Sequence, residues 1–239
     1  MSNVVLLDSR LHRKLRVHAR PAGSYGDNQR FVAVVVSEFP ALAMSYPILF
    51  SKNADTGQFY CGAMLGFDSG ENLFVEEQRA SSAYRPLNLQ RGPFLVAGSD
   101  LAIDLDHPRV APSGDQELFT ESGEPSGYLQ SIMGLMRELR PGLERTRIFI
   151  ETLMSLKLIE PLTISARFDD GLNREFTGLY TVSRDRLMEL ADAAVVDLFR
   201  RGYLQLIYLL LASLNHVSVL AQRKNRSFLP HPAPSIADS

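Results

Sequence analysis

The chain has 239 residues, of which 45% are hydrophobic, and a formal net charge of −2. This length and composition suit one large globular domain with a substantial buried core. Basic and acidic residues are mixed along most of the chain, so no electrostatic footprint for nucleic acid is present. One basic stretch, residues 10–20, is interleaved with apolar residues and is interpreted as the solvated face of a short amphipathic element.

The first hundred residues favour β-strands. Residues 31–36 (FVAVVV) form a β-branched run that is typical of a strand buried on both faces, and residues 46–50 (YPILF) indicate a second strand. Pro40 favours a short helix over residues 41–45 between them, because proline is tolerated in a first helical turn.

Two hairpins are predicted after these strands. Residues 59–67 and 73–75 are expected to pair across the polar turn between them, and residues 94–97 and 101–105 across Gly98-Ser99-Asp100. One mostly antiparallel, bent sheet accounts for all of these strands.

Helical periodicity begins near residue 124. Residues 126–139 carry one apolar stripe that Pro141-Gly142 is expected to end, and residues 143–158 repeat the stripe. Two separate helices that pack antiparallel or as a corner are therefore predicted.

The last part of the chain returns briefly to strands. Residues 162–168 and 175–182 flank an Asp-Gly turn, which is the strongest hairpin signal in the chain. Ser183 suits the N-cap of a following helix, and two further helices are expected over residues 192–201 and 203–221. The final segment, residues 228–239, is rich in proline and is interpreted as a flexible tail.

The predicted fold is α+β, with a mostly antiparallel bent sheet in the N-terminal half packed against a helix-rich C-terminal half. Residues 1–227 are expected to form a single domain, followed by the tail. No internal repeat is visible at a fixed period.

Compartment is inferred from three features. The single cysteine, Cys61, cannot form an internal disulfide, and its apolar surroundings indicate a buried, unreactive side chain. The N-terminus lacks the pattern of a secretory signal. The most apolar segment, residues 203–214, is twelve residues long and is interpreted as a core helix, so no transmembrane segment is expected. A cytoplasmic protein is predicted.

Common catalytic signatures are missing from the sequence. There is no GxSxG, GxGxxG, GxxxxGK[ST] or HExxH motif, and no cofactor is predicted. The most ligand-like cluster is Asp104, Asp106 and His107, for which a turn before Pro108 is the simpler interpretation. Paired carboxylates also occur, but general acid–base catalysis needs a burial pattern that a sequence does not reveal.

The chain carries a set of turn and strand-end residues: Glu38-Phe39, YPILF at 46–50, Leu65-Gly66, NLFV at 72–75, Tyr84, Pro86, Arg91, Pro93-Phe94, Ile103-Asp104, Leu118-Phe119, Gly123, GLY at 178–180, GYL at 202–204 and SLN at 213–215. This set resembles the bacterial SapC family, which is named for a surface-layer-associated protein. The resemblance spans roughly residues 10–224, and its motifs are mostly Pro, Gly, Phe and Asn at structural positions. One departure is that many relatives carry a tryptophan where this chain has Arg79-Ala80-Ser81-Ser82.

The resemblance implies a bacterial protein linked to cell-surface or outer-membrane processes. An unrelated peptide-transporter permease shares the family's name, and this chain lacks the spans that a permease needs. We expect a non-catalytic binding or accessory protein that contacts a protein partner or a small ligand. One alternative is a metal-dependent, oxygenase-like enzyme that uses His12 or His107 with Asp104, and another is a structural component of a surface layer.

Four residues are predicted to form the contact surface: Tyr84, Arg85, Asn88 and Arg91. Tyrosine and arginine are enriched at binding hot spots, and these four residues lie in a segment with no strand pattern. The competing interpretation is that Tyr84 and Arg91 only pack and pair at the base of a hairpin. No catalytic residue and no metal ligand is assigned.

Overall fold

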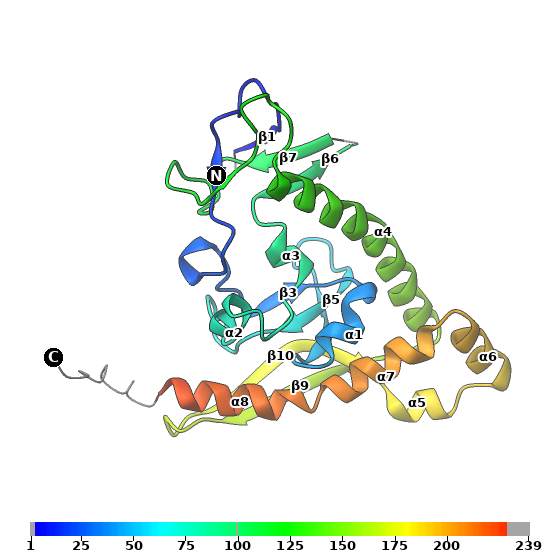
Figure 1. Ribbon diagram of the computed structural model, residues 1–239. Coiled ribbons are helices and arrows are strands. Elements are labelled where there is room, and N and C mark those ends of the chain that lie inside the picture. Colours follow the sequence, from blue (N-terminus) through cyan, green and yellow to red (C-terminus); the bar gives the residue numbers. More distant parts are fainter. Residues whose placement is uncertain (1–2, 99, 229–239) are drawn as a thin grey trace.

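The computed structural model describes residues 3–98 and 100–228 (Figure 1). Strands and helices are mixed, and the sheets are antiparallel, so the predicted α+β class is confirmed. The strands are β1 (Val4–Leu6), β2 (Arg16–Val17), β3 (Phe31–Ala33), β4 (Ile48–Lys52), β5 (Phe59–Met64), β6 (Phe94–Ala97), β7 (Asp100–Asp104), β8 (Gln116–Glu117), β9 (Ile159–Arg167) and β10 (Asn173–Val182). The helices are η1 (Gly23–Tyr25), η2 (Val36–Glu38), α1 (Phe39–Leu42), α2 (Val75–Arg79), α3 (Leu87–Gln90), α4 (Gly127–Ser155), α5 (Arg184–Met188), α6 (Asp192–Arg200), α7 (Tyr203–Ser213) and α8 (His216–Ser227).

The main sheet has five strands in the order β3-β5-β4-β10-β9. The hairpin β9–β10 was predicted and is confirmed, and it joins the N-terminal strands because β10 pairs with β4, with Tyr180 opposite Phe50. Helices α1 and α7 pack together, and α7 also contacts β4 and β10. The two halves of the sequence therefore share one sheet.

The expectation of a single sheet is wrong, because the strands of the described residues divide among separate sheets. The hairpin β6–β7 forms as predicted, but β1 pairs with the free edge of β7 and makes a separate three-stranded sheet, β1-β7-β6. A third, two-stranded sheet joins β2 and β8. Long-range pairing decided this division, and hydrophobic patterns do not specify which edges meet.

The expected hairpin between residues 59–67 and 73–75 does not form. Both edges of β5 are taken, by β3 and β4, and Leu73 keeps a single bond from its N–H to the Leu65 carbonyl at 2.8 Å. The Asn72 side chain accepts a hydrogen bond from the Phe74 N–H, and α2 begins at the next residue. Strand β3 is also shorter than the strand predicted over residues 31–36, because the chain enters η2 at Val36.

Helix α4 is continuous over 29 residues, so the prediction of two helices separated at Pro141 is wrong. Ser126 caps its first turn by accepting a hydrogen bond from the Leu129 N–H. An interior proline costs roughly 3 kcal/mol in a helix. The helix nevertheless continues because its two ends are buried in two different clusters of the core.

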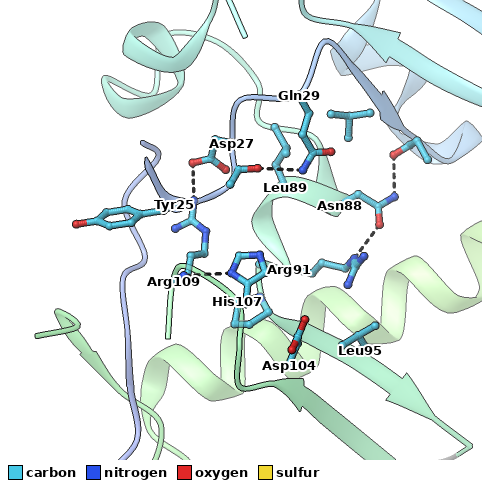
Figure 2. Close-up of a pocket in the computed structure, with 15 residues that line it drawn as sticks. Tyr25, Asp27, Gln29, Asn88, Leu89, Arg91, Leu95, Asp104, His107 and Arg109 are labelled. Atoms are coloured by element: carbon cyan, nitrogen blue, oxygen red, sulfur yellow. Dashed lines mark hydrogen bonds and ion pairs between the residues drawn. The ribbon is translucent and has the colours of Figure 1, made fainter. Parts of the chain in front are cut away.

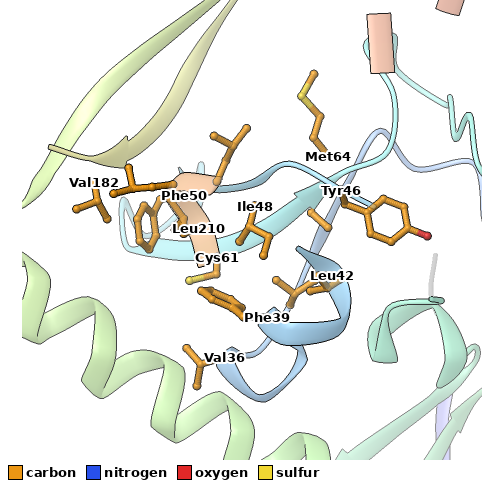
Figure 3. Close-up of a cluster of buried hydrophobic side chains, with 14 of the residues drawn as sticks. Val36, Phe39, Leu42, Tyr46, Ile48, Phe50, Cys61, Met64, Val182 and Leu210 are labelled. Atoms are coloured by element: carbon orange, nitrogen blue, oxygen red, sulfur yellow. The ribbon is translucent and has the colours of Figure 1, made fainter. Parts of the chain in front are cut away.

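The larger cluster lies between the main sheet and helices α1, α4 and α7, and Figure 3 shows Cys61 among its side chains. Burial raises the pKa of the Cys61 thiol, as expected for an unreactive cysteine. The smaller cluster lies under the β6–β7 sheet. Leu129, Ile132, Met136 and Leu139 of α4 belong to the smaller cluster, and Phe149, Ile150 and Leu153 to the larger one.

The C-terminal helices follow the predicted order, with one break. The helix expected over residues 203–221 divides into α7 and α8 at Leu214-Asn215. Helix α8 is held by the Lys224 ammonium, which contacts Asp68 at 2.7 Å and Glu71 at 2.5 Å. The predicted flexible tail lies outside the described residues apart from Phe228.

By length and composition alone, the stretch Tyr203–Ser227 would be able to cross a membrane. The mean hydropathy of its most apolar window is 1.7, and 28% of that window is buried. The core helix of a soluble protein meets the same criteria, so this is weak evidence. In this fold the stretch packs on the main sheet, where the Ser213 hydroxyl accepts a hydrogen bond from the Ile48 N–H at 2.8 Å.

Candidate functional site

A pocket of about 280 Å³ lies where the edge strand β3, the segment containing α3 and the β6–β7 sheet meet (Figure 2). Three stretches far apart in the sequence supply its lining: residues 25–33, 88–95 and 104–109. Its polar and charged side chains are Tyr25, Asp27, Gln29, Asn88, Arg91, Asp104, His107 and Arg109.

The pocket is braced by a buried charge cluster centred on Asp27, which is 1% exposed. The Asp27 carboxylate pairs with the Arg109 guanidinium at 2.5 Å and with that of Arg85 at 3.0 Å. It also accepts a hydrogen bond from the Ala22 N–H at 2.7 Å. Burial lowers the pKa of Arg85, while the nearby Asp27 charge acts in the opposite direction. Two guanidiniums share one carboxylate, so the cluster carries a net positive charge.

Arg91 is held in place by neutral groups. Its Nε donates to the Asn88 side-chain oxygen at 2.9 Å, and its Nη1 donates to the Phe94 carbonyl at 2.7 Å. Asn88 is itself fixed, because its Nδ2 donates to the Ala33 carbonyl on β3 at 2.7 Å. No carboxylate of the described residues forms an ion pair with Arg91, and burial lowers the pKa of its guanidinium.

His107 lies in the pocket beside Arg109 (Figure 2). Its Nδ1 accepts a hydrogen bond from the Arg109 backbone N–H at 3.1 Å, which assigns the hydrogen of the neutral ring to Nε2. Burial lowers the pKa of His107, and the neighbouring Arg109 charge lowers it further. The side chain is therefore neutral at pH 7 and offers one N–H donor.

A comparison with protein families gives one result. The SapC family model matches residues 7–220, which is most of the chain. The chain belongs to the SapC family. No curated protein and no solved structure matches it.

This SapC protein brings two of its four predicted contact residues into the pocket, Asn88 and Arg91. Arg85 lies behind the pocket. Its guanidinium pairs with the Asp27 carboxylate and donates to the Leu89 carbonyl at 2.8 Å. Tyr84 lies elsewhere, since its hydroxyl donates to Glu38 at 3.2 Å and its carbonyl accepts from the Tyr46 hydroxyl. That these four residues bind a ligand stays a prediction.

Of the residues considered for a metal site, two lie in the pocket and one does not. His107 and Asp104 both line the pocket, whereas His12 lies in the loop between β1 and β2, where its Nδ1 accepts from the Asp8 N–H at 3.0 Å. Within residues 3–98 and 100–228, no group of three or more His, Cys, Asp and Glu side chains is arranged to hold a metal ion.

Sequence reasoning missed Asp27 and Arg109, which are the most deeply buried charged residues of this SapC protein's pocket. Asp27 follows Gly26 and precedes Asn28, a composition typical of an exposed turn, and Arg109 follows Pro108 in another turn. The local sequence around each residue gives no indication that the side chain is buried. The burial follows from their ion pair, which joins positions 82 residues apart in the chain.

A larger cavity of about 580 Å³ lies on the main sheet, lined by residues that include Phe31, Tyr60 and Phe176. Its two charged lining residues, Arg30 and Glu175, are exposed, and neither forms an ion pair with another residue in the described part of the chain. The smaller pocket is the better candidate site, because its charged side chains are held in fixed positions.

Proposed function

We propose that this SapC family protein is a non-catalytic binding protein whose 280 Å³ pocket takes a small ligand. The observation that carries the proposal is the convergence of three distant chain segments on one braced pocket. Burying Asp27 with Arg85 and Arg109 carries a desolvation cost. Such an arrangement is typical of sites where charged groups must keep a fixed position.

The hydrogen bonds that connect the elements around the pocket support the proposal. Asn88 links β3 to Arg91, and Arg91 links α3 to the start of β6. Asn88 and Arg91 are therefore positioned before any ligand arrives, which reduces the entropic cost of binding. A protein partner at the same segment, a cytoplasmic location and a link to cell-surface processes belong to the same proposal and stay predictions. Cell fractionation would test the location.

A pocket-filling substitution tests the binding function. Ala33 is exposed on β3 and lines the pocket, so Ala33→Phe is expected to fill the pocket without disturbing the core. Ala97 is also exposed, on β6, and lies outside the pocket lining, so Ala97→Phe is the matched control. Both variants and the wild type would be screened by thermal shift against a library of small metabolites.

A stabilising compound is expected with the wild type and with Ala97→Phe, but not with Ala33→Phe. The proposal fails if no compound stabilises the wild type, or if Ala33→Phe responds as the wild type does. A crystal structure with the stabilising compound would show whether it occupies the pocket.

A further inference from the structure

We propose that the ligand of this pocket is a small anion with a carboxylate or phosphate group, and that the Arg91 guanidinium is its main contact. This inference rests on the proposed function and specifies the chemistry of the ligand. It is carried by the hydrogen bonds of Arg91, by the charges around the pocket and by the pocket's size.

Arg91 retains unused hydrogen-bond donors. An arginine side chain has about five N–H groups in a planar fork, and Arg91 uses its Nε and one hydrogen of Nη1. Its Nη2 has no hydrogen-bond partner among the described residues. The remaining donors suit the paired oxygens of a carboxylate or a phosphate.

The partners of Arg91 hold its orientation without neutralising its charge. An amide oxygen of Asn88 and a backbone carbonyl of Phe94 accept its two hydrogen bonds, and both acceptors are neutral. A partly buried cation that has lost water without gaining a counter-ion is unfavourable. A bound anion would supply the missing counter-charge.

The charges around the pocket also leave a positive excess. Arg91 and Arg109 line it together with Asp27 and Asp104, and Arg85 lies behind Asp27. Three guanidiniums thus accompany two carboxylates. Two of the guanidiniums, those of Arg85 and Arg109, share the single charge of Asp27, and Asp104 accepts hydrogen bonds from the N–H groups of Asn3 and Asp106.

His107 and the volume of the pocket narrow the ligand further. The neutral His107 ring offers a second donor, Nε2–H, on the same pocket wall as Arg109. A volume of about 280 Å³ lies just below the range of roughly 300–1,000 Å³ that is usual for drug-sized ligands. The anion is therefore expected to be small.

Titration calorimetry with two probes, inorganic phosphate and malonate, at constant ionic strength tests the inference and distinguishes the two chemistries. The wild type is expected to bind at least one probe saturably. Arg91→Gln is expected to weaken that binding by about tenfold or more, because a charge-assisted hydrogen bond is lost. The control, Arg145→Gln, changes an exposed arginine on α4 and should leave the affinity unchanged.

The outcomes separate this inference from the proposed function. If a neutral compound binds in the pocket and neither anion does, the inference is wrong and the binding function stands. If anions bind equally well to Arg91→Gln, they bind elsewhere and the inference is also wrong. If no compound and no anion binds, both fail. Urea unfolding of each variant would verify that it folds.

Discussion

The Asp27 carboxylate and the Arg109 guanidinium form an ion pair of 2.5 Å in which each side chain is only 2% exposed. Arg109 also donates to the carbonyls of His18, at 2.6 Å, and Arg20, at 3.1 Å. This one contact therefore ties the chain before β3 to the loop after β7, and it brings the two sides of the candidate pocket together.

Asp27→Asn is expected to lower the free energy of unfolding by about 3 kcal/mol or more, because it leaves Arg85 and Arg109 buried without a counter-ion. Urea unfolding monitored by circular dichroism would measure the change. The control is Glu144→Gln, which removes an exposed partner of Arg147 and should change stability little. Equal effects of the two substitutions would contradict the structural role given to Asp27.

Asn88→Asp is expected to weaken anion binding while the protein remains folded. The new carboxylate would lie next to the Arg91 Nε, which is 2.9 Å from the present amide oxygen, and would neutralise the guanidinium. It would also lose the hydrogen bond that the Asn88 Nδ2 donates to the Ala33 carbonyl. Calorimetric titration with phosphate or malonate measures the loss, expected to be about tenfold. Asn53→Asp serves as the control, since Asn53 is exposed and its side-chain oxygen accepts backbone N–H groups of its own turn. Binding by Asn88→Asp at the wild-type affinity would argue against a role for the Arg91 charge.

Glu38 is expected to make stability depend on pH. Burial raises the pKa of this carboxyl above its ordinary value of 4.5, although the N–H groups of Leu87 and Val35 partly oppose the shift. The folded state therefore binds more protons than the unfolded state once the pH exceeds 4.5. The contribution of Glu38 to stability falls as the pH rises from there through the folded-state pKa.

Comparison with Glu38→Gln isolates this contribution. The amide cannot accept from both backbone N–H groups, so the variant is expected to be less stable than the wild type at low pH. The difference in the free energy of unfolding should narrow as the pH rises, because only the wild type loses stability through this group. Urea unfolding at a series of pH values would measure it, and a difference that widens with pH would overturn the assignment.

Two glycines of α4 are expected to respond to alanine in opposite directions. A Cβ at Gly142 would lie 2.9 Å from a methyl group of Val35, which is β-branched and has little freedom to move. A Cβ at Gly134 would meet nothing within 4 Å. Gly134→Ala should stabilise the protein by about 1 kcal/mol through helix propensity, whereas Gly142→Ala should destabilise it. Thermal unfolding distinguishes the two, and stabilisation by both would mean that α4 is not closely packed against Val35.

Local sequence was enough to locate several elements of this SapC protein. The hairpins β6–β7 and β9–β10 follow from turn residues beside apolar runs, and the apolar stripe over residues 126–139 indicates the first part of α4, because such signals act within a short stretch of chain. The α+β class follows from the same patterns. Asn88 and Arg91, which were predicted as contact residues from residue type and from a segment with no strand pattern, line the pocket, and that they bind a ligand stays a prediction.

Tertiary structure decided the rest, because the deciding interactions join residues far apart in the chain. Helix α4 continues through Pro141 only because its two ends are buried in different parts of the core. Residues 73–75 form no strand because β3 and β4 occupy both edges of β5. Asp27 and Arg109 stand in ordinary turns of the sequence, and only folding excludes water from the pair and so makes it part of a pocket.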